Sequence, residues 1–275
     1  MWGLNLFATK LGVHEIPAIF FATLRLLIML LIAGPWLRWF PGQMADLFRV
    51  AMFTGAGGFG LLALGSGLSK DVSTVAIFSQ LIVPFSALLS VLMLGEVIHW
   101  RRKAGIALAF IGVFIIGFDP RAFSYLAGLS CVALQGLSAA LGMVYVKRLR
   151  GISPMQLQAW ISVFALPVVL GLSLLFEHQP IAAAASASYL AWGAVLTAAL
   201  GSSLIGQSGF FYLLKRYPVS SVAPMTVLST VFGMIAGVLF NHDVLTGRML
   251  LGGAVTLVGV VIIELRTKSM MAPSA

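Results

Sequence analysis

Long apolar stretches follow one another along almost the whole chain, with connections of only a few residues between them. A stretch of about 20 apolar residues can cross the hydrocarbon core of a bilayer as a helix. Within that core every backbone polar group must be paired inside the protein, which favours α-helices. Charged residues make up 9% of the chain, against about 25% in a soluble protein. The sequence therefore predicts an all-α, polytopic membrane protein without a soluble catalytic domain.

The apolar pattern predicts ten transmembrane helices. Their expected ranges are 1–12, 16–34, 47–68, 72–94, 103–118, 125–146, 154–176, 188–214, 219–240 and 248–265. A helix of about 12 residues rises only about 18 Å, which does not cover a hydrocarbon core of about 30 Å. We therefore expect a piece of the first helix to be missing from the start of this sequence.

Two segments of the chain are copies of each other. At a constant offset of 147 residues, 16 of the 45 positions of segment 72–116 are identical in segment 219–263. The most informative matches are the pairs Gly105/Gly252, Gly112/Gly259 and Arg101/Arg248. Five helices per copy place the second copy upside down in the membrane. The sequence thus predicts two inverted five-helix repeats, 1–120 and 121–275, an architecture typical of transporters with alternating access.

The chain has a net charge of +9, and its basic residues are divided unequally between the two expected sides of the membrane. If the N-terminus is cytoplasmic, the inner side holds twelve Lys and Arg residues. The outer side then holds only Lys10, Lys70, Arg121 and Arg248. This positive-inside bias predicts that both termini are cytoplasmic. The basic residues are interpreted as an orientation signal, and we expect no nucleic-acid partner.

Motifs of several function classes are missing or misplaced. The run Gly55–Gly60 matches G-x-G-x-x-G, but it lies inside an expected membrane span, where small residues allow close helix packing. No Walker A sequence is present, and the chain has a single cysteine, Cys131. The four histidines fall at expected helix ends or in loops. We therefore expect no enzyme activity, no cofactor and no metal site.

Several residues stand in a characteristic order in the two copies. They are Trp2-Gly3, Lys10, Arg25, Glu96, Gly105 and Gly112 in the first copy, and Pro224, Asp243, Gly252 and Gly259 in the second. This order resembles the drug/metabolite transporter superfamily, EamA type, over nearly the whole chain. Asp243 departs from the family pattern, because Glu is usual there. The resemblance implies a ten-helix bundle around a central cavity. It also implies export of amino acids or related metabolites across a bacterial inner membrane.

Arg25 is the one basic residue well within an expected helix. A charge inside the membrane is costly and must face protein, water or a partner. Arg25 is therefore a candidate for binding a substrate carboxylate. The alternative is a structural role, in which the side chain bonds to backbone carbonyls or extends towards the interface.

Neutral polar residues deep in the spans are further candidates for substrate binding. Gln80, Gln135 and Gln207 each supply donors and an acceptor, which suits the two ends of a zwitterion. Asn5 and Ser138 are repeat-related, and Ser203 lies one turn before Gln207. The alternative for each residue is a hydrogen bond that joins two helices.

Aromatic residues and prolines complete the candidate site. The residues Phe59, Phe78, Trp160, Phe211 and Tyr212 could form an apolar wall, or could pack against helices and lipid. Pro84 and Pro224 interrupt expected helices and are interpreted as hinges, with a static kink as the alternative.

The acidic residues bear on how transport is driven. All eight Asp and Glu residues lie at or near the ends of expected helices, so no carboxylate is placed to carry a proton through the membrane. We therefore expect facilitated export of a small molecule by a monomer that contacts only its substrate and the bilayer. A nucleotide-sugar, phosphate-ester or drug transporter of the same superfamily, or a channel, remains the alternative.

Overall fold

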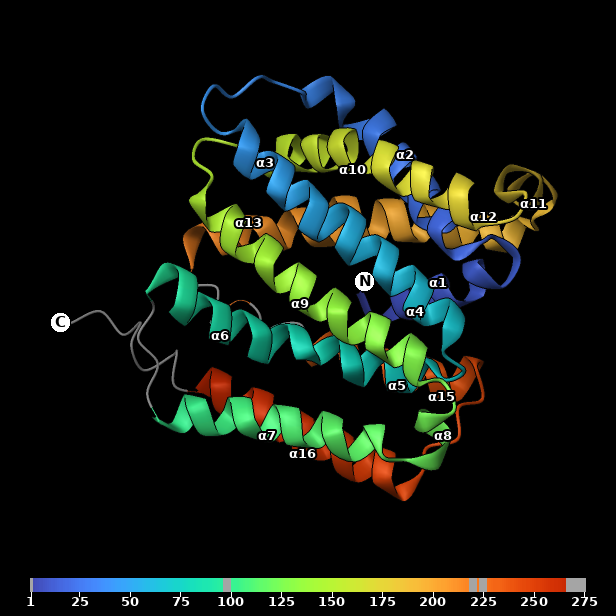
Figure 1. Ribbon diagram of the computed structural model, residues 1–275, viewed down its shortest axis with the longest axis vertical. Helices are drawn as coiled ribbons and strands as arrows, with labels where there is room; N and C mark the ends of the chain where they lie inside the picture. Colours follow the sequence, from blue (N-terminus) through green and yellow to red (C-terminus); the bar gives the residue numbers. More distant parts are fainter. Residues whose placement is uncertain (1, 96–99, 218–221, 223–226, 266–275) are drawn as a thin grey trace.

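The computed structural model of the protein describes residues 2–95, 100–217, 222 and 227–265. All regular structure in these residues is helical, and the helices run side by side in one bundle (Figure 1). Among these described residues, six helices are long and apolar enough to cross a membrane, namely 18–36, 44–68, 72–94, 126–148, 154–176 and 189–216. The predicted all-helical class is confirmed for the described residues, and the bundle is consistent with a polytopic membrane protein.

Each of the ten predicted ranges overlaps helical structure. The elements of the first half are α1 (Trp2–Glu15), α2 (Ala18–Ala33), η1 (Gly34–Trp36), α3 (Met44–Val50), η2 (Ala51–Gly60), α4 (Leu61–Leu68), α5 (Val72–Phe78), η3 (Ser79–Leu81), α6 (Ile82–Leu94) and α7 (Trp100–Gly117). Those that follow are α8 (Pro120–Phe123), α9 (Leu126–Arg148), α10 (Pro154–Phe176), α11 (Pro180–Ser186), α12 (Tyr189–Leu196), η4 (Thr197–Gln207), α13 (Ser208–Arg216), α15 (Val227–Phe240) and α16 (Gly247–Leu265). The short helices α8 and α11 lie in connections and were not predicted.

Among the described residues, four of the long spans change helix type along their length. The span 18–36 ends in the 3₁₀ segment η1. The span 44–68 passes through the π-helix η2, and the span 189–216 passes through the π-helix η4. The span 72–94 tightens into the 3₁₀ segment η3 just before Pro84. Proline has no N–H, so it cannot bond to the carbonyl of Gln80 four residues earlier. Pro84 thus lies beside a local change of helix geometry, while Pro224 lies outside the described residues. The hinge role of both stays a prediction.

The two halves of the chain pack mainly against each other. Helix α7 runs along α16, α2 along α10, α4 and α6 along α9, and α1 along α15. Each of these pairs joins a segment before residue 120 to a segment after it. The halves therefore build one continuous bundle, and any cavity between them is lined by both.

The contact between α7 and α16 depends on glycine. A Cβ atom on Gly105 would lie 2.7 Å from the carbonyl oxygen of Gly259, and one on Gly112 would lie 2.5 Å from that of Gly252. Since the earlier α7 residue meets the later α16 residue, the two helices run antiparallel. Figure 1 shows this pair along the lower edge of the bundle. Small residues let helix backbones approach this closely in membranes.

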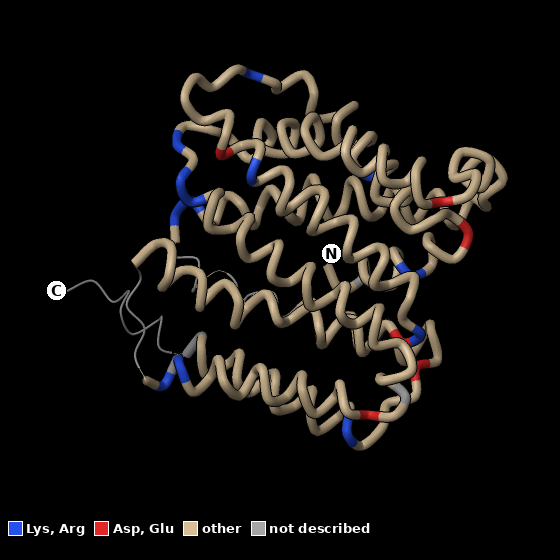
Figure 2. Tube along the Cα trace, in the orientation of Figure 1, with Lys and Arg blue, Asp and Glu red and all other residues tan. Residues whose placement is uncertain are grey.

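Acidic side chains cap helices of the opposite half. The carboxylate of Glu177 accepts hydrogen bonds from the N–H groups of Ile19 (2.7 Å) and Phe20 (2.9 Å) at the start of α2. Asp243 accepts one from the N–H of Ser73 (2.7 Å) at the start of α5. The first N–H groups of a helix have no partner within it, so these bonds stabilise the helix starts. Most Asp and Glu lie at one end of the bundle, whereas Lys and Arg gather at the other (Figure 2).

Candidate functional site

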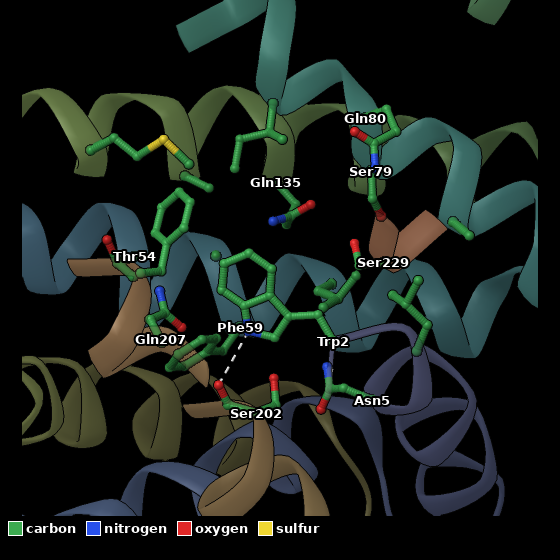
Figure 3. Close-up of a pocket in the computed structure, with 18 of the residues that line it drawn as sticks. Trp2, Asn5, Thr54, Phe59, Ser79, Gln80, Gln135, Ser202, Gln207 and Ser229 are labelled. Carbon is green, nitrogen blue, oxygen red and sulfur yellow. Dashed lines mark hydrogen bonds between the residues drawn. The ribbon is translucent and has the colours of Figure 1, made fainter. Parts of the chain in front are cut away.

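A cavity of about 130 Å³ lies between helices of both halves (Figure 3). A single water needs only about 10–15 Å³ of such space, so the cavity can hold several waters or a small organic solute. Most of its wall is apolar, with a few polar groups converging on it, as in small-molecule binding sites. The polar lining residues are Trp2, Asn5, Arg25, Thr54, Ser79, Gln80, Gln135, Ser202, Gln207 and Ser229.

Both π-helical segments contribute to the wall of this cavity. Thr54 and Phe59 come from η2, whereas Ser202 and Gln207 come from η4. Extending the 147-residue offset of the predicted repeats to this region pairs 51–60 with 198–207, which is η4 without its first residue. A π-helix is rare and is frequently found at functional sites. The same unusual backbone therefore occurs twice beside the cavity, once before and once after residue 120.

Arg25 places a buried positive charge on the cavity wall. Its side chain is 4% exposed, and its Nε donates a hydrogen bond of 2.6 Å to the hydroxyl of Ser203. The guanidinium carbon lies 3.9 Å from the ring centroid of Phe59, a cation–π contact. Among the described residues the one ion pair joins Arg49 to Asp46. Neutral groups therefore hold Arg25 in place, and no described carboxylate neutralises it.

A neutral network supports Arg25 from behind. The hydroxyl of Ser203 also donates to the carbonyl of Ala198 (3.0 Å) within η4. The amide of Gln158 on α10 donates to the carbonyl of Ser203 (2.7 Å). Ser203 and Gln158 are both fully buried. These bonds position the serine that receives the Arg25 hydrogen bond.

The cavity amides differ in how their hydrogen bonds are satisfied. Gln80 donates to the hydroxyl of Thr230 and so joins η3 to α15. By contrast, the side-chain oxygens of Asn5 and Gln135 are buried and accept no hydrogen bond from the described residues. Buried polar groups are normally hydrogen-bonded. Asn5 and Gln135 are thus available to a bound molecule, whereas Gln80 also holds two helices together.

Aromatic rings form much of the apolar wall. The indole N–H of Trp2 donates to the carbonyl of Ser202 (3.2 Å), and its ring lies 5.0 Å from that of Phe210. Phe59 and Phe211 also line the cavity. Figure 3 shows the Trp2 side chain reaching between the polar groups from its place near the chain start.

The structure brings seven of the predicted site residues together on this wall. They are Asn5, Arg25, Phe59, Gln80, Gln135, Gln207 and Phe211. Ser203 lies directly behind Arg25. Phe78 is buried in the protein, and Ser138 donates to the carbonyl of Phe53 (2.8 Å), so both lie outside the lining. The role of these residues in binding a substrate stays a prediction.

Trp160 and Tyr212 do not belong to the lining. Trp160 donates to the carbonyl of Arg38 (2.9 Å) and stacks on Phe164, away from the cavity. Tyr212 is 46% exposed and lies under Arg216. Neighbouring residues of a helix with about 3.6 residues per turn point in directions about 100° apart. Phe211 rather than Tyr212 therefore faces the cavity.

Several residues of the site were not among the predicted ones. Trp2, Thr54 and Ser229 line the cavity, and Gln158 supports it. Gln158 could have been found by the signal that identified the other amides, since it is also an amide within a span. Within the described ranges no three His, Cys, Asp or Glu residues gather into a group that could hold a metal ion.

Sequence comparison identifies relatives along almost the full chain. The profile of the EamA-like transporter family matches residues 1–118 and 126–265. The chain is 25% identical to a protein of Escherichia coli (strain K12) named "Probable amino-acid metabolite efflux pump", covering 95% of this chain and 90% of that protein. It is 26% identical to a protein of Streptantibioticus cattleyicolor named "Probable terminal-alkyne amino-acid exporter", covering 81% of this chain and 74% of that protein.

A solved structure has the same fold. It aligns with a TM-score of 0.67 at 17% sequence identity, covering 97% of this chain and 94% of the other. The family profile, in contrast, spans nearly the whole sequence in two consecutive matches. The protein therefore belongs to the EamA-like transporter family and is a multi-pass membrane transporter.

Proposed function

We propose that this protein is a secondary transporter that exports amino acids, or related small metabolites, across a bacterial inner membrane by alternating access. The cavity carries this proposal, because it combines a buried cation, Arg25, with unpartnered amides in an apolar enclosure. Such a lining suits a molecule with one carboxylate and one ammonium group. The aromatic wall favours neutral or aromatic side chains. The relatives named as amino-acid metabolite efflux pumps support the same class of cargo.

The lining argues against doubly charged phosphate esters and nucleotide sugars. Such substrates need several cationic groups, since phosphate recognition relies on Arg and Lys. Among the described lining residues Arg25 is the one cation. A zwitterion therefore fits the charge of the cavity better than a dianion.

Ten membrane spans in two inverted repeats, 1–120 and 121–275, are part of this proposal. The glycine contacts between α7 and α16 support it. Gly105 meets Gly259, and Gly112 meets Gly252. The repeat counterparts of Gly105 and Gly259 are Gly252 and Gly112. The contact between Gly105 and Gly259 and the contact between Gly252 and Gly112 are therefore equivalent, as a two-fold axis between the repeats requires. The recurring π-helix and the two matches to the family profile support the same architecture.

The orientation follows from the charge distribution. We place the end of the bundle where Lys and Arg gather in the cytoplasm (Figure 2). Both termini are expected on the cytoplasmic side, as the charge distribution of the sequence predicts. The cavity then lies between a basic inner end and an outer end where carboxylates cap helices.

Transport is expected to run down a substrate gradient without obligatory proton coupling. The described cavity lining contains no Asp or Glu. Asp243 caps α5, and Asp119 accepts a hydrogen bond from Thr246 (2.5 Å), so both have structural partners outside the cavity. In proteoliposomes, gradients of L-leucine or L-phenylalanine alone should drive saturable flux with little response to an imposed pH gradient.

Two results would contradict this expectation in different ways. Proton-driven uphill accumulation that Asp243→Asn abolishes would show that the carboxylates take part in coupling. Saturable flux of nucleotide sugars, with none of either amino acid, would contradict the proposed cargo.

A further inference from the structure

The two kinds of polar group on the cavity wall are chemically distinct. Arg25 offers only hydrogen-bond donors, with a permanent positive charge. The amides of Asn5 and Gln135 make no hydrogen bond with any described residue, and their oxygens are buried. Building on the proposed function, we infer that the cavity binds its amino acid in one orientation. The carboxylate lies at Arg25 and Ser202, and the ammonium group lies at the oxygens of Asn5 and Gln135.

The carboxylate end is defined by the donors that Arg25 has left. Of its five N–H groups, Nε bonds to Ser203 (2.6 Å), and one at Nη2 reaches Ser202 at a longer 3.4 Å. Phe59 covers one face of the guanidinium, and the remaining N–H donors point outwards in the guanidinium plane. An arginine held in this way binds a carboxylate through two parallel hydrogen bonds. A substrate carboxylate at Arg25 would supply the counter-charge that the described protein lacks.

The ammonium end is defined by the unpaired amides. An ammonium group has three N–H donors and no acceptor, so it needs oxygens rather than a cation. Asn5 on α1 and Gln135 on α9 belong to different halves of the bundle and both line the cavity. Neither side-chain amide is hydrogen-bonded to a described residue, so rotation of the amide group breaks no hydrogen bond. Either residue can therefore present its oxygen to the substrate. One substrate group would therefore bridge the two halves.

This orientation makes the cavity selective for molecules that carry both groups. A site built to hydrogen-bond a group strongly rejects an analogue without it, because buried polar atoms are then left unpaired. An amine without a carboxylate leaves Arg25 unneutralised. A carboxylic acid without an ammonium group leaves the two amides unpaired.

Competition on the wild-type protein tests the inference without any substitution. Labelled L-leucine counterflow in proteoliposomes is measured against unlabelled L-leucine, 3-methylbutylamine and 4-methylpentanoate. A parallel series uses L-phenylalanine, 2-phenylethylamine and 3-phenylpropanoate. We expect each analogue to need a concentration about tenfold higher, or more, than its amino acid for equal inhibition. Equal inhibition by an amine and its amino acid would overturn the inference while leaving the proposed function standing. Absence of flux for both amino acids would contradict the proposed function itself.

Two substitutions test which group of the substrate binds at Arg25 and which binds at Gln135. Arg25→Gln should raise the half-saturating concentration of L-leucine about tenfold or more, and should leave inhibition by 3-methylbutylamine within about twofold of wild type. Gln135→Leu should have the opposite pattern. It should weaken the binding of L-leucine and the inhibition by 3-methylbutylamine, and leave the inhibition by 4-methylpentanoate unchanged. Arg25→Lys keeps the charge, so it provides the test if Arg25→Gln does not fold. Equal weakening of all three compounds by both Arg25 variants would contradict the assignment.

Discussion

Replacing Gly112 with alanine is expected to lower the thermal stability of the purified protein sharply. A Cβ atom at this position would lie 2.4 Å from the backbone nitrogen of Thr256 and 2.5 Å from the carbonyl oxygen of Gly252. Both are backbone atoms, so no side-chain rotation relieves the clash and α7 must move away from α16. Overpacking of this kind costs about 1–3 kcal/mol or more. For a chain of this size that cost corresponds to a fall in melting temperature of about 2–12 °C.

Gly117→Ala is the matched control, since Gly117 lies on the same helix and nothing is within 4 Å of its added Cβ atom. Alanine is a better helix former than glycine, so this variant should be as stable as the wild type or slightly more stable. Melting is followed by tryptophan fluorescence in detergent, with folded yield measured by size-exclusion chromatography. Equal melting temperatures for the two variants would show that α7 and α16 do not pack through glycine.

The second large effect is expected on transport. Gln207 lies at the end of η4 on the cavity wall, and no described residue is hydrogen-bonded to its side chain. Gln207→Leu keeps the size and suits the membrane, but it removes the donors and the acceptor that face the cavity. Leucine flux should fall about tenfold or more, while folded yield stays at the wild-type level.

Gln80→Leu is the informative comparison. Gln80 bonds to Thr230 across two helices, so its loss should reduce both flux and melting temperature. In Gln207→Leu we therefore expect flux to fall while folded yield stays unchanged. In Gln80→Leu we expect flux and folded yield to fall together. Wild-type flux in both variants, with normal yield, would return both glutamines to a purely structural role.

The helices were predictable because a long apolar stretch crosses the bilayer as an α-helix, in which the backbone hydrogen bonds are satisfied within the segment. The place of Arg25, Gln80 and Gln135 on the cavity wall was predictable for a related reason, since a polar group in a membrane span usually faces the bundle interior or a cavity. The π-helical segments were not predictable. A π-helix is rare, so a long apolar stretch is expected to be α-helical throughout its length.

Other parts of the site depend on how each helix is rotated about its axis. Phe211 and Tyr212 are adjacent in sequence, and only packing decides that Phe211 faces the cavity. Trp2 was noted only as part of the family pattern. Figure 3 shows its side chain on the cavity wall, a position that depends on how α1 packs in the bundle.

Protection of a cysteine in the cavity tests most directly whether the substrate binds there. Cys131 is the one cysteine of the chain, so Cys131→Ala provides a background without thiols. In this background Ser79→Cys places a thiol on the cavity wall, and Ser186→Cys places one on the exposed helix α11 as the control. Saturating L-leucine should slow modification of Ser79→Cys by a methanethiosulfonate reagent about tenfold and leave Ser186→Cys unchanged. An unchanged rate at Ser79→Cys, in protein that still transports L-leucine, would contradict binding in this cavity.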